Sequence, residues 1–252
     1  MDEKTKTEVA AGRNPVLELL RSQRELECVY LQKGLEKGPV GRIVALAKER
    51  GVPVKETTAE KLQALSGISS HQGVAAVLSA AAYSRMEDIF RRAGEEPLFL
   101  VLADGIEDPH NLGAIIRTAE GAGAHGVIIP KRHSAGLTAA AVKTAAGAAA
   151  HLPVVRVPNL VAAMKELRDK KGLWFYCADM DGQPWCQADL TGPTAIVIGS
   201  EGRGVSRLVK EKCDLTVSLP IRGQVNSLNA SVAAGILCYE AVRQRMRGGQ
   251  TV

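Results

Sequence analysis

The sequence predicts two α/β units, of which the larger contains a parallel sheet with helices on both faces. Three observations predict this fold class. Short apolar runs alternate with helical segments along most of the 252 residues. The runs are nearly continuous, as from Ala195 to Ile198, which is typical of parallel strands that helices bury on both faces. A charged stretch over 81–97, closed by Gly94 and Pro97, interrupts the alternation and indicates a boundary between the units.

The first unit is predicted over residues 1–80, as a small α/β domain, and the stretch over 81–97 as a linker with a short helix. Asn14 followed by Pro15 is a typical helix start, because asparagine caps a helix and proline fits its first turn. The expected strands are 27–31, 52–55 and 74–78, and further helices are expected at 40–50 and 59–65.

The second unit is predicted over residues 98–252. In its last helix Leu228, Val232, Ile236 and Tyr239 recur at helical spacing and are expected to form the buried stripe. Ordinary topology rules favour an unknotted sheet for such an alternating pattern. The expected strands are 98–103, 126–130, 153–157, 173–178, 194–199 and 214–219, and the expected helices are 111–123, 137–149, 158–171, 205–212 and 227–247.

Composition narrows the class of protein. The formal net charge of +5 comes from 32 basic and 27 acidic residues spread along the chain, which permits RNA binding without demanding it. Aromatic residues make up 4% of the chain, which argues against recognition by rows of stacked bases. Apolar runs fall short of the roughly 20 residues that span a bilayer, and the first residues do not resemble a signal peptide, so we expect a cytoplasmic protein. The five cysteines form no Cys-x-x-Cys pair, and no zinc or other metal site is predicted.

The loop from Gly199 to Gly204 is the first candidate site. It carries three glycines and the carboxylate of Glu201 directly after an apolar strand, and glycines let backbone approach a ligand closely. About twenty residues later Ser227 and Asn229 precede a long helix, so one pocket is predicted for the two segments. A dinucleotide-binding fingerprint is disfavoured, because the glycines are spaced G-x-x-G-x-G rather than G-x-G-x-x-G.

Three segments, over 108–119, 196–204 and 224–233, resemble the three signature motifs of the SpoU (TrmH) family of S-adenosylmethionine-dependent RNA ribose 2′-O-methyltransferases, in the knotted SPOUT class. The resemblance covers roughly residues 98 to 247. Residues 12–19 and 71–74 are also similar to the substrate-binding domain of family members that act on a guanosine of bacterial large-subunit rRNA. The resemblance implies a C-terminal trefoil knot, an N-terminal domain like ribosomal protein L30e, and a homodimer whose interface completes the site.

The resemblance also implies site residues. Arg117 stands where the family has its catalytic arginine, and Asn111, Glu201, Ser227 and Asn229 stand at other catalytic positions. A guanidinium stays protonated, so gripping an RNA phosphate and stabilising a developing alkoxide suit Arg117 better than acting as a base. The cofactor S-adenosylmethionine is expected to contact Gly199, Gly202, Leu219 and Leu228.

Each of these residues also has a purely structural interpretation. Arg117 could be an exposed helix arginine or form an ion pair, and Asn111 could be the N-cap of its helix. Glu201 could accept backbone N–H bonds at a helix start, and Ser227 could cap the last helix. His110 and His71 are assigned no chemistry, and His71 is expected to serve a turn before Gly73.

The implied function is methyl transfer to a ribose 2′-hydroxyl, of a guanosine in 23S rRNA. A tRNA 2′-O-methyltransferase is the alternative with the same chemistry. A catalytically silent RNA-binding or ribosome-assembly protein is the alternative from another class, although Arg117, Glu201, Ser227 and Asn229 are all present. RNA and a second copy of the chain are the expected partners, with no membrane and no DNA.

Overall fold

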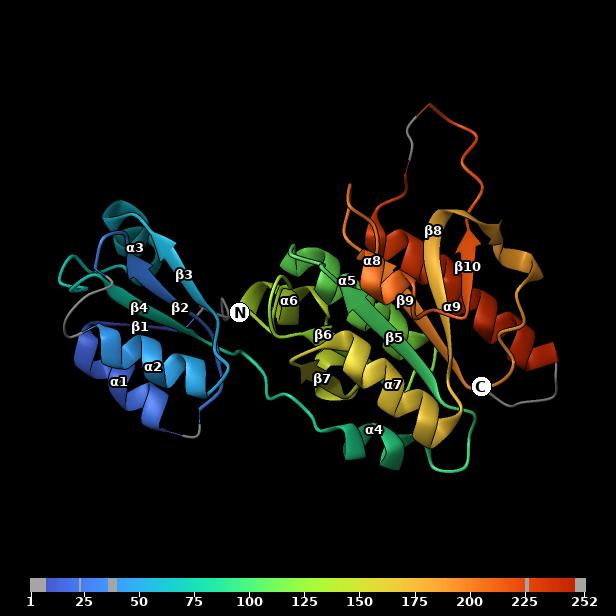
Figure 1. The fold of residues 1–252 in the computed structure, drawn as a ribbon, viewed down its shortest axis with the longest axis horizontal. Helices are drawn as coiled ribbons and strands as arrows, with labels where there is room; N and C mark the ends of the chain where they lie inside the picture. The colour runs from blue at the N-terminus through green and yellow to red at the C-terminus, as the bar shows by residue number, and fades with distance from the viewer. Residues whose placement is uncertain (1–7, 23, 36–39, 225–226, 248–252) are drawn as a thin grey trace. The chain divides into compact units, whose positions relative to one another are not determined.

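The computed structural model describes residues 8–22, 24–35, 40–224 and 227–247, and the chain forms two compact units (Figure 1). The first unit comprises the chain up to Ala82 together with residues 136–140, and the second comprises residues 83–135 and 141 onward. Both units contain a sheet and helices, which agrees with the predicted α/β class.

The first unit has a mixed four-stranded sheet in the order β1-β4-β2-β3. Strands β1 and β2 are antiparallel to β4, and β3 is parallel to β2. The predicted strands and helices of this unit are present, whereas the three-residue β1 was not predicted. The elements are β1 (Val9–Ala11), α1 (Arg13–Arg21), β2 (Leu26–Gln32), α2 (Gly41–Glu49), β3 (Val54–Thr57), α3 (Ala59–Ser66) and β4 (Val74–Leu78).

Two signature segments of the first unit meet at one turn. The backbone N–H of Gly12 donates to Val74 at 2.9 Å, and that of Arg13 donates to the side chain of Gln72 at 3.0 Å. Gly12 is the N-cap of α1, so the prediction that Asn14 caps this helix is wrong. His71 is buried and accepts from the N–H of Gly73 at 3.0 Å, so it serves the turn as expected.

The second unit has six strands in the order β10-β8-β9-β5-β6-β7, all parallel to their neighbours. The prediction of a parallel sheet is confirmed, and each predicted strand is present. The strands are β5 (Phe99–Asp104), β6 (Gly126–Pro130), β7 (Val154–Val157), β8 (Trp174–Pro184), β9 (Thr194–Gly199) and β10 (Leu215–Ser218). The α-helices are α4 (Met86–Ala93), α5 (Pro109–Gly121), α6 (Ala139–Thr144), α7 (Leu160–Lys171), α8 (Arg207–Lys210) and α9 (Ala230–Arg247).

Three predicted helices are shorter in the structure. The helix expected over 137–149 ends at Thr144, because Ala146 and Gly147 take positive φ values of 49° and 93°, and a 3-10 turn follows at Ala148–Ala150. The helix expected over 205–212 is the four-residue α8. The last helix begins at Ala230 rather than at residue 227.

The segment predicted as a linker contains α4, whose Ile89 and Ala93 are buried in the core of the second unit. The N–H of Arg85 donates to Asp88 at 2.8 Å and fixes the start of this helix.

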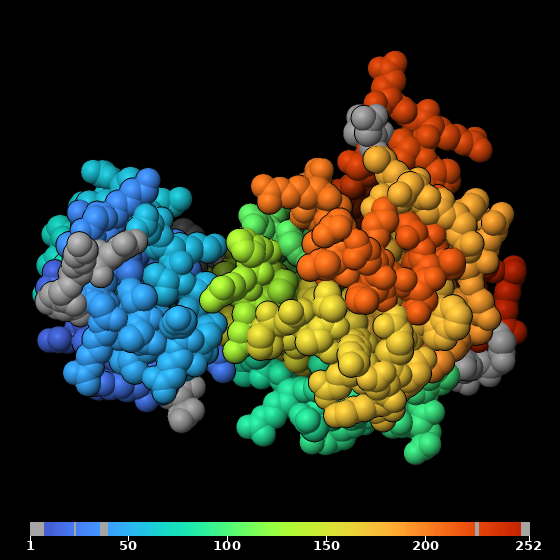
Figure 2. All heavy atoms as spheres, in the orientation of Figure 1, coloured from blue at the N-terminus to red at the C-terminus, as the bar shows by residue number. Residues whose placement is uncertain are grey.

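Residues 219–224, which follow β10, protrude from the second unit and are drawn in orange-red in Figures 1 and 2.

The buried stripe predicted for α9 is wrong. Val232 is 49% exposed and Tyr239 is 53% exposed, whereas Ala234, Leu237 and Ala241 are buried. Helix α9 packs on α5 and β9, and these contacts bury the face that carries Ala234, Leu237 and Ala241. Val232, Tyr239 and Met246 lie on the other side of the helix and are left exposed.

The strand order places a site at the middle of the sheet. From β5 the chain continues to β6 on one side, and β9 lies on the other side with Asp104 opposite Gly199. In open parallel sheets, ligands bind at the carboxyl ends of the strands where the order reverses. The glycine loop leaves β9 at this point.

Candidate functional site

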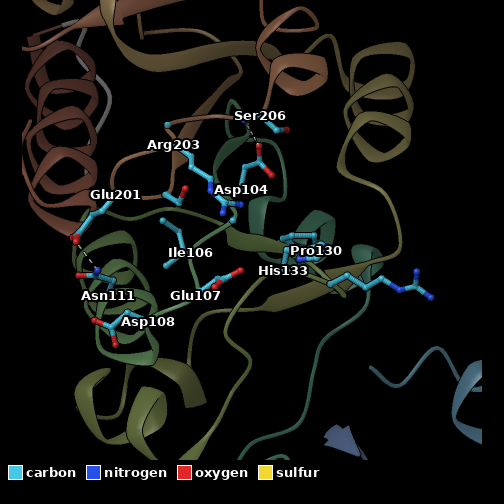
Figure 3. A pocket seen from close by; sticks show the side chains of 14 residues that line it. Asp104, Ile106, Glu107, Asp108, Asn111, Pro130, His133, Glu201, Arg203 and Ser206 are labelled. Atoms are coloured by element: carbon cyan, nitrogen blue, oxygen red, sulfur yellow. Dashed lines mark hydrogen bonds between the residues drawn. The ribbon is translucent and has the colours of Figure 1, made fainter. Parts of the chain in front are cut away.

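Three polar side chains from distant parts of the sequence form one hydrogen-bonded cluster. Glu201, in the loop after β9, accepts through one oxygen from the amide of Asn111 at 3.0 Å and from the amide of Asn229 at 2.5 Å. The two asparagines also join directly, at 2.9 Å. Figure 3 shows Glu201 and Asn111 turned toward one another. The structure thus brings together three of the five predicted catalytic residues.

Asn111 is free to join the cluster because another residue caps its helix. Asp108 accepts from the N–H of His110 at 3.0 Å, and Pro109 occupies the first turn of α5. The interpretation of Asn111 as the N-cap is therefore wrong. His110 contacts Thr144 Oγ1 through its ring nitrogen at 3.2 Å.

Asn229 both caps α9 and joins the cluster. Its side-chain oxygen accepts from the N–H of Ser231 at 2.9 Å and of Val232 at 3.3 Å, while its amide nitrogen donates to Glu201. A cap satisfies N–H groups that the helix leaves unpaired. The expectation that Ser227 caps this helix is wrong, because the helix begins later than predicted.

The glycine loop folds back on itself. Ser200 and Gly204 exchange two backbone hydrogen bonds, at 3.1 and 2.9 Å. A methyl group at Gly199 would lie 2.0 Å from the carbonyl carbon of Gly204, which no side chain tolerates. Gly199 thus has no room for a side chain, whereas Gly202 and Gly204, with φ of 85° and 66°, take backbone conformations that favour glycine.

A cavity of about 440 Å³ lies against one side of this loop. Its walls include all four residues predicted to bind cofactor, and Ser227 and Glu201 as well. The predicted cofactor residues on its walls are Gly199, Gly202, Leu219 and Leu228.

The residues present fit S-adenosylmethionine. Ile198, Val217, Leu219 and Leu228 give the cavity apolar walls that suit an adenine ring. Glu201 adds a carboxylate that accepts only from neutral amides, and carboxylates suit the positive sulfonium and ammonium groups of this cofactor. The space and the donor set therefore match a molecule that is apolar at one end and cationic at the other.

A second cavity, of about 600 Å³, is also lined by this loop, and Figure 3 shows the side chains around it. Ser200, Glu201, Arg203 and Gly204 line both cavities. Asn111 lines only the second. The two cavities thus meet at the glycine loop, where the Asn111–Glu201–Asn229 cluster stands.

Arg117 is not part of this cluster. It is exposed on α5, and it makes no hydrogen bond or ion pair with any residue that the structure describes. The ion pair considered in the sequence analysis is therefore absent from the described part of the chain.

Sequence reasoning missed two polar groups at the site. Asp104, at the end of β5, accepts from the N–H of Ser206 at 2.7 Å and holds the far end of the glycine loop. Its position at the reversal of strand order could have marked it. Lys210 bonds Asp179 at 2.9 Å and Asp181 at 2.8 Å, and these two carboxylates raise the pKa of the lysine. No local sequence pattern indicates that Lys210 forms ion pairs with Asp179 and Asp181.

The comparisons with known proteins agree with this geometry. The SpoU rRNA methylase family profile matches residues 98–239, and the profile for RNA 2′-O ribose methyltransferase substrate binding matches residues 9–84. The chain belongs to the SpoU (TrmH) family of RNA methyltransferases. It is 43% identical, over 95% of its length and 96% of the relative's, to YacO of Bacillus subtilis, whose name assigns it to the TrmH family of tRNA/rRNA methyltransferases.

Solved structures give the same result. One similar structure is that of the SpoU methyltransferase AviRb from Streptomyces viridochromogenes in complex with the cofactor S-adenosylmethionine. Its sequence is 28% identical to this chain and the TM-score is 0.62; the match covers 96% of this chain and 92% of AviRb. The TrmH/SpoU tRNA-modifying enzyme of A. aeolicus is 27% identical, with a TM-score of 0.55, 65% of this chain covered and 85% of that one. Enzymes of this family use S-adenosylmethionine, so the cofactor prediction is confirmed.

Across residues 8–22, 24–35, 40–224 and 227–247, no helix is both long and apolar enough to cross a membrane. The same described residues contain no group of three His, Cys, Asp or Glu side chains arranged to hold a metal ion.

Proposed function

We propose that this SpoU-family enzyme transfers the methyl group of S-adenosylmethionine to a ribose 2′-hydroxyl of RNA, on a guanosine of the large-subunit rRNA. One observation carries the proposal. The cluster of Asn111, Glu201 and Asn229 stands where two cavities meet, and one of these cavities has the dimensions and lining of a cofactor site. Transfer of a methyl group from a bound cofactor to a bound RNA requires that their two binding cavities adjoin.

Displacement at a sulfonium methyl group requires the attacking oxygen, the methyl carbon and the leaving sulfur to lie in line. In the proposed mechanism the backbone of the glycine loop, with Leu219 and Leu228, orients the cofactor. Asn111 and Asn229, fixed by Glu201, orient the ribose, and Ser227 adds a hydroxyl at the cofactor side. As the new O–C bond forms and the C–S bond breaks, the 2′-hydroxyl gives up its proton to solvent, and the guanidinium of Arg117 stabilises the developing alkoxide or its neighbouring phosphate.

The proposal includes a homodimer. Val232, Tyr239 and Met246 recur every seven residues on α9 and are 49%, 53% and 62% exposed. Residues seven apart share one face of a helix, and exposed apolar side chains on one face favour association. A second copy against this face would complete a site to which Arg117, exposed on the adjoining α5, contributes. Glutamate at Val232 and at Tyr239 together should give a monomer in sedimentation experiments and abolish turnover.

We assign RNA selection to residues 1–80 and catalysis to residues 98–252; the intervening segment 81–97 contains α4, which packs into the core of the second unit. The substrate-binding profile over residues 9–84 supports this division. The tRNA-modifying relative covers only 65% of the chain, which favours rRNA over the alternative of a tRNA substrate. The same proposal includes an L30e-like fold for the first unit, a C-terminal trefoil knot and a cytoplasmic location. It also includes a closer likeness to the rRNA guanosine 2′-O-methyltransferase RlmB.

Mapping 2′-O-methyl groups in the rRNA and tRNA of cells with and without this gene tests the function. One guanosine of large-subunit rRNA should lose its methyl group in the cells without the gene, and the purified protein should restore it. A lost methyl group on tRNA would support the alternative substrate. Binding of RNA with no change in methylation would support the silent RNA-binding alternative.

Arg117→Ala gives a second test. Methyl transfer should be abolished and cofactor affinity should change by no more than a few-fold, since the guanidinium is assigned to the RNA side of the site. The loss should fall mostly on kcat, as for an interaction made in the transition state. Loss of cofactor binding with normal turnover at saturation would contradict the assignment.

A further inference from the structure

The second cavity carries basic side chains whose role is open. Arg132 and His133 line it from the loop after β6, and Arg203 lines it from the glycine loop. All three are exposed and make no hydrogen bond or ion pair with any other residue in the described ranges. Two guanidinium groups therefore border this cavity with their donors available.

The loop after β6 is held in a strained conformation. His133 has a φ of +54°, which is uncommon for a residue with a side chain and costs of order 1 kcal/mol or more. The neighbouring loop enforces it, because Ala135 N–H donates to Ile106 at 2.6 Å and Ser134 Oγ lies 3.4 Å from the same carbonyl oxygen. Strain of this kind persists where the surroundings fix it, often at ligand sites.

The acidic groups of the cavity are mostly engaged elsewhere. Asp104 accepts from the N–H of Ser206, Asp108 from that of His110, and Glu201 from the amide of Asn111. Glu107 is the remaining carboxylate on the wall; it is exposed and has no partner in the described part of the chain. Three of the four carboxylates thus already accept hydrogen bonds from neutral groups, whereas Arg132 and Arg203 keep all their guanidinium donors available for a ligand.

We infer that the second cavity receives the acceptor nucleotide and that Arg132 and Arg203 bind the phosphate beside its ribose. The inference rests on the proposed function, since the ribose must meet the cofactor's methyl group where the two cavities join. Arg203 lines both cavities and Arg132 lines the second, so a phosphate next to a ribose in the second cavity has guanidinium groups within the same lining. Guanidinium groups bind phosphate through two parallel hydrogen bonds, which positions a substrate without reading its sequence.

The test uses the full-length protein and unmodified rRNA from cells lacking the gene, with KM and kcat for methyl transfer measured across salt concentrations. Arg132→Ala should raise KM for RNA about tenfold and reduce the log-log salt slope by about 0.7 to 0.9, the contribution of one phosphate contact. The kcat should stay within about twofold, because a contact made equally before and during reaction changes KM. Arg132→Lys, which keeps the charge, should keep the salt slope.

Lys165→Ala is the matched control, since it removes one exposed positive charge from α7, away from the cavity lining. Its KM and salt slope should match the unmodified protein, and S-adenosylmethionine affinity by calorimetry should be the same in all variants. Unchanged KM and slope in Arg132→Ala, or equal effects in Lys165→Ala, would overturn the inference while leaving the proposed function intact. Absence of methyl transfer by the unmodified protein would instead refute the proposed function, and the inference with it.

Discussion

Replacement of Glu201 separates the hydrogen bonds of the cluster from its charge. Both asparagine amides donate to the same oxygen, Glu201 Oε1, at 3.0 and 2.5 Å. In Glu201→Gln the side-chain carbonyl can stand where Oε1 stands and accept from both amides, so the geometry is retained and the negative charge is lost. In Glu201→Ala both acceptor interactions are lost.

The structure sets the size of the effect on stability. A hydrogen bond contributes about 0.5 to 1.5 kcal/mol net, and one to a charged group about 1.5 to 3 kcal/mol. Glu201 and Asn229 are exposed, so water replaces the lost partner and the lower range applies. Glu201→Ala should therefore lower the free energy of unfolding by about 1 to 2 kcal/mol, and Glu201→Gln by less than about 1 kcal/mol.

Thermal unfolding and methyl-transfer kinetics on the same preparations provide the assay. If the cluster serves to orient Asn111 and Asn229, Glu201→Ala should lower kcat at least a hundredfold while Glu201→Gln keeps about a tenth of it, because about 1.4 kcal/mol corresponds to a factor of ten. An equal loss of kcat in the two variants, each with unfolding energy near that of the unmodified protein, would show that charge rather than orientation matters, and an unchanged kcat in both would show that neither does; either result would refute the reasoning.

Three other substitutions have defined outcomes. Gly199→Ala should abolish cofactor binding in calorimetry, because its methyl group would lie 2.0 Å from backbone, whereas Gly192→Ala, with open space around it, should bind normally. Arg245→Ala should lower the free energy of unfolding by about 3 kcal/mol or more in urea titrations, since the buried guanidinium donates to three backbone carbonyls that would lose their partners. Burial lowers the pKa of His125, so protonation of this histidine disfavours the folded state. The stability that the neutral histidine contributes is therefore fully present above about pH 6.5 and declines below it. His125→Gln should make the free energy of unfolding vary less between pH 7.5 and 5.5.

The elements of the second sheet could be predicted because their apolar runs are short and continuous. The observed strand β6 matches the predicted range of 126–130, and β9 matches 194–199. Helix ends were predicted less well, because several polar residues near each end could serve as the cap. At α5 both Asp108 and Asn111 were available, and only the fold, which draws Asn111 to Glu201, distinguishes them.

The inward face of α9 could not be predicted from hydrophobicity. The spacing of Val232 and Tyr239 is that of a buried stripe, yet the contacts with α5 and β9 bury the face that carries Ala234, Leu237 and Ala241 instead. Arg245 shows the same limit, because a C-terminal arginine normally faces solvent, whereas here it lies 4.7 Å over the ring of Phe99. Contacts between distant segments decide both cases.

The loop from Gly199 to Gly204 belongs to two cavities, which has a thermodynamic consequence for any ligands that occupy them. A ligand that stabilises one position of the loop changes the affinity of the other cavity, and by linkage the reverse effect has the same size. The cofactor loses its positive sulfonium charge when the methyl group leaves. The electrostatic attraction between the cofactor in one cavity and the RNA in the other therefore changes when the methyl group is transferred. The affinity of the enzyme for RNA should accordingly differ before and after the reaction.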